Sequence, residues 1–74
     1  MLSRHAKNRL RRYAKYGITA ELVIQLVENE VAAGVEGDGM AFFPSGAGDF
    51  RIAFVAKNQT ATIKTIMPPR RSHL

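Results

Sequence analysis

The feature that most constrains the fold is a basic segment at residues 3–16, SRHAKNRLRRYAKY, whose apolar residues recur at helical spacing. On a period of about 3.6 residues they share one stripe: Ala6, Leu10, Tyr13 and Ala14. The segment also contains six of the eleven Lys and Arg residues and no acidic residue. An apolar stripe of this kind must face a core. The segment therefore predicts an amphipathic surface helix, with Ser3 as its N-cap and Gly17 after its end.

A second stripe follows the border between the buried and the solvated sides of this helix. Its members are spaced i, i+4, i+7 and i+11: His5, Arg9, Arg12 and Tyr16. His5 falls in the first turn, where the helix dipole and the nearby arginines disfavour a positively charged ring. A neutral imidazole can accept a proton, as a general base must. The stripe therefore favours a phosphate-binding cleft with a proton-transfer group, and a merely solvated helix face is the alternative.

The charges of the chain are segregated along its length. Residues 1–17 contain six basic and no acidic side chains, residues 18–50 contain six acidic and no basic ones, and residues 51–74 contain five basic and no acidic ones. With a net charge of +5, the chain is expected to bind a polyanion or an acidic protein. If the two basic ends meet in the fold, they form one positive surface backed by a negative one.

Length and composition limit the kinds of protein that fit this sequence. Seventy-four residues form one small domain of limited stability. The chain has no Cys, which removes disulfides and thiolate metal sites and favours a reducing, cytoplasmic location. Neither a secretion signal nor a membrane-spanning segment is expected, because the apolar runs are too short. No cofactor is expected, and no metal site either, since His5 and His73 lie at opposite ends of the chain without a ligand-like neighbour.

A second helix is predicted after Thr19, which can serve as its N-cap. Ile18 and Val23 have the spacing of a hydrophobic staple across this cap. The apolar residues of the helix spread over a wide arc: Leu22, Val23, Leu26, Val27 and Val31. We therefore expect the second helix to be more buried than the first and to form part of the core.

After the second helix, glycines and prolines indicate turns. The motifs GVEGDG and GAGD lack the lysine of a P-loop and are interpreted as turns rather than phosphate cradles. Between them, residues 40–43 form a short apolar strand that Pro44 closes, and residues 44–49 form a loop by composition. The sequence thus indicates a change from helix to sheet.

Two further strands follow. Residues 50–55 alternate as a half-buried strand does, and the motif FRIAFVA is interpreted as core packing, because it lacks the glycine and basic opening of an RNA-recognition strand. Residues 60–67 form a second β-rich run, which Pro68 ends. The turn at residues 57–60 predicts that the two strands pair as a hairpin.

The order of these elements predicts an α+β fold. Two N-terminal helices pack on one face of a small antiparallel sheet of three to four strands. Residues 1–67 form a single compact domain, and residues 68–74 form a flexible basic tail.

The motifs HAKNRL, GITAELV and IKTIMPP resemble a known family over nearly the full length of the chain, most weakly in the middle. The small bacterial domain-of-unknown-function family 4258 typically opens with His-Ala-x-x-Arg-Met/Leu. It continues through an Arg-Gly-Ile-Ser/Thr turn and closes with a strand of valine or isoleucine, threonine, a bulky residue and proline. The family is generally placed near RelE- and BrnT-like toxins, in a wider group of metal-independent ribonucleases with two helices on an antiparallel sheet. The resemblance therefore implies a toxin-like ribonuclease.

The resemblance also assigns individual positions. The matches are the opening histidine, the arginine that follows, the Gly-Ile turn and the strand threonine: His5, Arg9, Gly17, Ile18 and Thr65. The chain departs from the family by three extra residues between Arg9 and Gly17. Tyr16 consequently stands where the family has an arginine, so that arginine is either lost or supplied by Arg12.

The first functional hypothesis is a metal-independent endoribonuclease of a toxin–antitoxin pair. The candidate catalytic residues are His5, Arg9, Arg51 and Thr65, and the candidate nucleic-acid contacts are Arg9, Arg12, Tyr16, Arg51 and Lys64. The arginines would hold the scissile phosphate, while His5 moves a proton to or from the ribose 2′-hydroxyl or the leaving oxygen. This hypothesis predicts that His5, Arg9 and Arg51 lie within one concave basic surface.

The second hypothesis is a non-catalytic nucleic-acid-binding or protein-interaction module, in which the same surface only grips phosphates. A third is an inactive chain whose basic face docks an acidic antitoxin-like protein. RNA is the partner expected first, the antitoxin-like protein is the alternative, and no membrane is expected.

Overall fold

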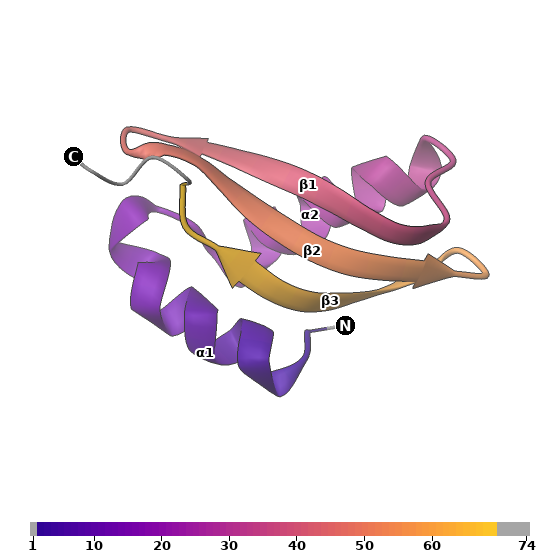
Figure 1. The fold of residues 1–74 in the computed structure, drawn as a ribbon, viewed down its shortest axis with the longest axis horizontal. Coiled ribbons are helices and arrows are strands. Elements are labelled where there is room, and N and C mark those ends of the chain that lie inside the picture. Colours follow the sequence, from indigo (N-terminus) through magenta and orange to yellow (C-terminus); the bar gives the residue numbers. More distant parts are fainter. Residues whose placement is uncertain (1, 70–74) are drawn as a thin grey trace.

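The computed structural model describes residues 2–69 of the 74-residue chain as two helices and a three-stranded sheet (Figure 1). The elements are α1 (Arg4–Tyr13), the 3₁₀ helix η1 (Ala14–Tyr16), α2 (Ala20–Ala32), β1 (Gly37–Ser45), β2 (Gly48–Lys57) and β3 (Thr60–Met67). The strands are antiparallel in the order β1-β2-β3, and both helices pack on one face of the sheet. The predicted α+β fold is thus confirmed, with three strands. None of the described helices is long and apolar enough to cross a membrane.

The first helix begins as predicted and ends earlier. The Ser3 hydroxyl accepts a hydrogen bond from the Ala6 amide at 3.1 Å, which is the expected N-cap. The α-helix stops at Tyr13, and the next turn is 3₁₀ up to Gly17, whose φ of 87° is left-handed as expected after a helix. The tighter turn changes the angular step per residue. Ala14 is therefore exposed, and its predicted place in the buried stripe is wrong.

The second helix is more buried than the first, as predicted, but its apolar arc is not buried throughout. The Thr19 hydroxyl accepts a hydrogen bond from the Leu22 amide at 3.2 Å, so the predicted cap is confirmed. Val23 and Val27 are buried, but Leu22 is 44% exposed, and its predicted place in the core is wrong. A sheet of three strands shared with α1 is too narrow to cover the whole apolar arc of α2.

The hairpin that joins β2 and β3 is confirmed. Its turn residues Asn58 and Gln59 have φ values of 54° and 64°, both left-handed, as a tight two-residue hairpin turn requires. Strand β3 has the predicted bounds. One register shift interrupts the pairing, because Ala53 faces Thr65 whereas Phe54 faces Ile63. The shift leaves one extra residue in β3.

Strand β1 is longer than predicted. It continues through Pro44 to Ser45, and the predicted loop at residues 44–49 shrinks to a two-residue tip between Ser45 and Gly48. The Ser45 hydroxyl donates to the Gly48 carbonyl at 2.6 Å and accepts from the Ala47 amide at 3.2 Å, which closes the tip. β1 is an edge strand, where a missing N–H removes little of the ladder, so Pro44 does not end it.

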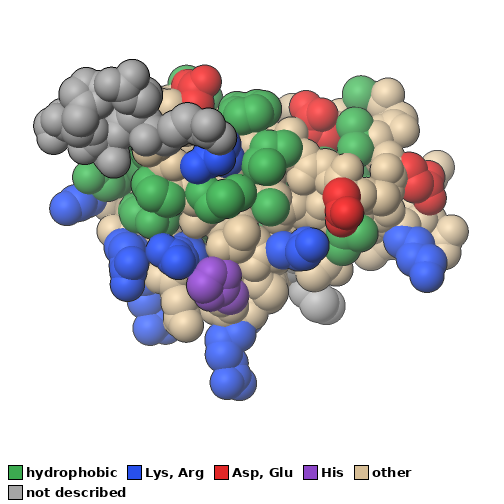
Figure 2. Space-filling view, in the orientation of Figure 1, with side chains coloured by type: hydrophobic (Ala, Val, Ile, Leu, Met, Phe, Trp, Pro, Cys, Tyr) green, Lys and Arg blue, Asp and Glu red, His purple; other side chains and the backbone are tan. Residues whose placement is uncertain are grey.

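The two faces of the sheet differ. We call the face that the helices cover the inner face, and the opposite one the outer face. Within residues 2–69, no helix covers the outer face (Figures 1 and 2). The core therefore lies on one side of the sheet only.

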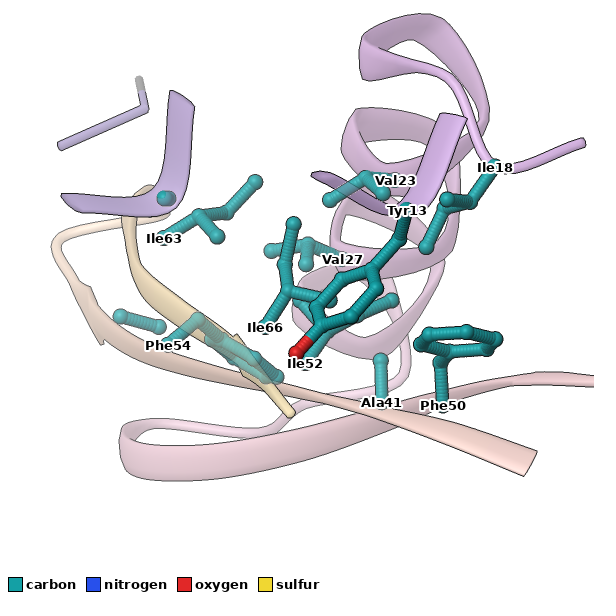
Figure 3. Packing of buried hydrophobic residues seen from close by; sticks show 12 residues of the cluster. Tyr13, Ile18, Val23, Val27, Ala41, Phe50, Ile52, Phe54, Ile63 and Ile66 are labelled. Carbon is teal, nitrogen blue, oxygen red and sulfur yellow. The ribbon is translucent and has the colours of Figure 1, made fainter. Parts of the chain in front are cut away.

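The core is built on the inner face of β2 (Figure 3). As the alternation predicts, the buried side chains of this strand are every second one: Phe50, Ile52, Phe54 and Ala56. From the helices, the buried residues are Ala6, Tyr13, Val23 and Val27, with Ile18 between them. The Phe50 ring lies 5.1 Å from that of Tyr13 and 5.4 Å from that of Tyr16, so one residue of β2 holds the end of α1 and η1.

The start of the predicted tail contacts the domain. The Pro68 carbonyl accepts a hydrogen bond from Arg51 Nη2 at 3.4 Å. Pro69 lies against Gly48, since a Cβ added at that glycine would be 2.9 Å from the Pro69 Cβ. Residues 70–74 of the predicted tail lie outside the described residues.

Gly39→Ala is predicted to destabilise the fold. Gly39 faces Phe54 across β1 and β2, and an added Cβ would lie 2.8 and 2.9 Å from the Cε2 and Cε1 atoms of that buried ring. Overpacking of this kind costs about 1–3 kcal/mol. The measurement is the denaturant midpoint of unfolding. Gly46→Ala is the control, because nothing lies within 4 Å of its added Cβ; equal midpoints for the two variants would contradict the prediction.

Ser3→Ala is predicted to cost more stability than Thr19→Ala. Both variants lose an N-cap, at about 1 kcal/mol each. Only Ser3 also donates its hydroxyl to the Lys64 carbonyl, at 2.8 Å, which ties α1 to β3. Loss of that bond adds about 1 kcal/mol. Urea titrations of the two variants test the difference, and the tie is unimportant if the two costs are the same.

Candidate nucleic-acid interface

The position of the border stripe, His5, Arg9, Arg12 and Tyr16, follows from how α1 is attached to the sheet. Leu2 forms a parallel bridge with Ile63, and the Ser3 amide donates to the Ile63 carbonyl at 3.0 Å. Ala6 and Tyr13 then point into the core, so α1 lies along β3 with its border stripe beside the sheet. The attachment fixes which side chains of α1 remain at the surface.

The border stripe contains a chain of side-chain hydrogen bonds. Arg9 Nη1 donates to the Tyr13 hydroxyl at 3.3 Å, and Arg9 Nε donates to His5 Nε2 at 3.4 Å. Tyr13 is buried and Arg9 is half-buried, whereas His5 is exposed. The core thus holds Tyr13, Tyr13 orients Arg9, and Arg9 contacts the histidine. Because His5 Nε2 accepts this bond, neutral His5 carries its proton on Nδ1.

The other two members of the stripe differ in setting. Arg12 is exposed on the last turn of α1. Tyr16 belongs to η1 and packs on Phe50 while remaining 42% exposed, and Lys15 Nζ lies 5.4 Å from its ring centre. Tyr16 is therefore part of the packing of the helix end as well as of the surface.

The remaining candidate residues lie on the sheet. Arg51 and Thr65 alternate with buried neighbours, so they point to the outer face, and both are half-buried. Arg51 Nη2 donates to the Pro68 carbonyl, while its Nε is buried without a hydrogen-bond partner among residues 2–69. Lys64 is the extra residue of the register shift, and its Nζ lies 3.9 Å from Asp38 Oδ1.

The cations of α1 are not neutralised by the rest of the chain. Within residues 2–69, the one ion pair is that between Lys64 and Asp38. Figure 2 shows most of the Lys and Arg side chains gathered over α1, whereas the acidic side chains are spread over the upper and right-hand parts of the view. The six cations between residues 4 and 15 thus form an unneutralised positive surface, which attracts polyanions.

The structure brings together some of the candidate residues and separates others. His5 and Arg9 are in contact. Among the described residues, no hydrogen bond or ion pair joins Arg51 to either of them, because α1 packs toward the inner face and Arg51 points to the outer face. Figure 2 nevertheless shows α1 and the outer face on the same side of the molecule. The expected single concave surface is replaced by two neighbouring surfaces with β3 between them.

Two features were not predicted from the sequence. The Tyr13 hydroxyl is the acceptor that orients Arg9, and the spacing of four residues between Arg9 and Tyr13 is a signal that could have indicated this. An open groove of about 550 Å³ lies between α2 and the β2–β3 hairpin, and both apolar residues such as Ile24 and Val31 and polar ones such as Glu28 and Gln59 line it. This groove contains no residue of the border stripe, and no local sequence pattern indicates the groove.

To bind a metal ion, the described part of the chain would need several side chains that could hold the ion together. No group of three or more His, Asp or Glu side chains among residues 2–69 is arranged to hold a metal ion. His73, weighed above as a ligand, lies outside these residues.

Comparison with known proteins assigns no function, so the proposal below is based on the fold and the side-chain geometry. No family model matches the sequence, and neither a curated protein nor a solved structure matches the chain. The resemblance to family 4258 therefore stays a prediction that rests on the short motifs at residues 5–10, 17–23 and 63–69.

Proposed function

We propose that this protein binds RNA through the phosphates of the strand, with the border stripe of α1 as its contact surface. The observation that carries the proposal is the set of six cations between residues 4 and 15, none of which forms an ion pair within residues 2–69. Phosphate contacts supply most of the affinity of sequence-independent binding. The cytoplasmic location favoured by the lack of Cys suits an RNA ligand.

Arg9 is the best-prepared phosphate ligand of the stripe. Its guanidinium is half-buried and is oriented by the buried Tyr13 hydroxyl, so little side-chain freedom remains to be lost on binding. Arg12 lies three residues further along α1 and can hold a second phosphate. Lysines on the far side of the helix contribute long-range attraction only.

A second candidate function is cleavage of the bound RNA without a metal ion, favoured by the contact between Arg9 and His5. In such a reaction the ribose 2′-oxygen attacks phosphorus, the bond from phosphorus to the 5′-oxygen breaks, and a 2′,3′-cyclic phosphate forms. The proton of the 2′-hydroxyl passes to a base, and the 5′-oxygen receives a proton from an acid or from water. His5 is the imidazole of the stripe, and Arg9 stabilises the charge that develops on the phosphate.

The hydrogen bond from Arg9 to His5 has a consequence for this reaction. While Arg9 Nε occupies the Nε2 lone pair, that nitrogen cannot take a proton from the substrate. A phosphate that draws the Arg9 guanidinium toward itself frees Nε2 to act as the base. Substrate binding would in this way prepare the histidine. Thr65 lies on the outer face of β3, and within residues 2–69 no hydrogen bond joins it to His5, so it has no role in this step.

The toxin-like relation and the acidic antitoxin-like partner remain part of the proposal only through the sequence resemblance. A module that binds RNA without cleaving it, or that docks an acidic protein on α1, uses the same cations. Cleavage is what separates these alternatives.

Binding to RNA is predicted to weaken steeply with salt. About four phosphate contacts on a single strand give a slope near −3 for log K against log salt. The double variant Arg9→Glu/Arg12→Glu should lose more affinity than its charge-matched control Lys7→Glu/Lys15→Glu, because only the first pair borders the core. Fluorescence anisotropy at several salt concentrations measures both effects. Equal losses in the two variants would indicate a diffuse positive field instead of a site.

Any cleavage is predicted to resist EDTA and to depend on His5. Removal of a general acid or base usually lowers the rate by about 10² to 10⁴. His5→Ala should therefore nearly abolish cleavage and leave RNA affinity within a few-fold, while Arg9→Ala lowers both. The assay follows a mixed-sequence RNA and the 2′,3′-cyclic phosphate at the new ends, with Lys7→Ala as the surface control. Unchanged cleavage by His5→Ala would remove it from the mechanism, and an inert wild type would leave only the binding function.

A further inference from the structure

The outer face of the sheet exposes a compact apolar area. Its two most exposed members lie on β1: Phe42 is 52% exposed and Met40 is 39% exposed. Across the strands they are flanked by half-buried side chains that point the same way: Ala53, Val55 and Met67. Figure 2 shows a group of apolar side chains on this face, to the left of the centre of the view. An exposed cluster of this kind marks a contact surface more often than a lone apolar residue does.

The strand register places Phe42 opposite a cation, Arg51. It lies directly across from Arg51 in the register of β1 and β2, so their side chains are neighbours on the outer face. Arg51 is half-buried, and its Nη2 is held by the Pro68 carbonyl. The face therefore presents an aromatic ring next to a positioned guanidinium, which are the two groups that receive a base and its phosphate.

Charge favours a polyanion on this face. The cations of α1 border this face on the β3 side (Figure 2). Lys64, the unpaired residue of the register shift, adds a cation whose Nζ lies 3.9 Å from Asp38 Oδ1. Of the two carboxylates on this face, Asp38 lies opposite Val55 and is paired with Lys64, and Asp49 lies opposite Pro44, next to the pair of Phe42 and Arg51. Arg51 forms no ion pair within residues 2–69, and the six cations between residues 4 and 15 outnumber these two carboxylates.

We propose that the outer face is a base-stacking platform for single-stranded RNA, in which one base stacks on Phe42 and an adjacent phosphate binds Arg51. The proposal rests on the RNA-binding function proposed for α1 and extends the same strand across β3. β1 and β3 are about 10 Å apart, at two strand spacings. A few nucleotides therefore connect the platform to Arg9. A duplex keeps its bases stacked on one another and cannot offer one to Phe42.

The test compares a single-stranded RNA 12-mer with the duplex of the same sequence, using the full chain at low salt. Loss of one stacking side chain lowers single-strand affinity about tenfold or more. Phe42→Ala should therefore bind the single strand at least about tenfold more weakly and the duplex within twofold of wild type. Phe42→Tyr keeps a ring and should bind like wild type. Leu22→Ala is the control, since it removes an exposed apolar side chain from α2, which lies on the other side of the sheet, and it should bind both RNAs like wild type.

The outcomes separate the platform from the function on which it rests. If wild type binds neither RNA, both proposals fall. If wild type binds RNA but Phe42→Ala loses no single-strand affinity, or loses duplex affinity equally, the platform is wrong and the α1 site stands. The remaining alternative is that the outer face binds a second copy of the chain, and sedimentation of the same samples tests it. In that case wild type is a dimer, Phe42→Ala dissociates it, and the RNA affinity does not change. Circular dichroism confirms that each variant is folded.

Discussion

The packing of the inner face of β2 against both helices is the contact on which the rest of the structure depends. Phe50 contacts the rings of Tyr13 and Tyr16, while Phe54 packs over Gly39 of the neighbouring strand. Both helices share this one face, so a chain of 74 residues obtains a single core between one sheet and one layer of helices. The same arrangement leaves the outer face of the sheet without a helix among residues 2–69. The position of the core and the exposure of the outer face therefore have the same cause.

The core also determines how charge is distributed in space. Because Tyr13 and Ala6 direct the apolar stripe of α1 inward, its cations can only point away from the core. The acidic side chains of residues 18–50 lie on α2, at the start of β1 and at the start of β2, and none lies on α1. Segregation along the chain thus becomes segregation on the surface (Figure 2). Within residues 2–69 a single ion pair crosses between the two halves, so most of the positive field stays available for a partner.

The parts of the fold that the sequence predicts well have local causes. Ser3 and Thr19 cap helices through their own hydroxyls, and the bounds of β3 follow from a β-rich run between a turn and Pro68. The parts that it misses depend on distant neighbours. Pro44 is tolerated because β1 is an edge strand, and Leu22 stays exposed because the sheet is too narrow for the arc of α2.

The candidate site shows the same difference between contacts within one helix, which the sequence predicts, and contacts between elements, which it does not. The contact of His5 with Arg9 is a spacing of four on one helix, which a sequence displays directly. The separation of Arg51 from that pair depends on which face of the sheet α1 covers, and no local pattern encodes it. The outward orientation of Phe42 could not be predicted either, because the continuous apolar run at residues 40–43 does not show which of its side chains face the core.

The exposure of Phe42 and Met40 is difficult to explain by stability alone. A small domain has a total stability of about 5–15 kcal/mol, and two exposed apolar side chains on its sheet contribute little to it. A ligand present at about 100 times its dissociation constant adds about 2.7 kcal/mol to the folded state. Covering the outer face with RNA would thus add a substantial fraction of the stability that a one-sided core supplies. In the proposed complex, α1 holds the phosphates, the sheet receives the base, and the ligand covers the face of the sheet on which no helix of residues 2–69 lies.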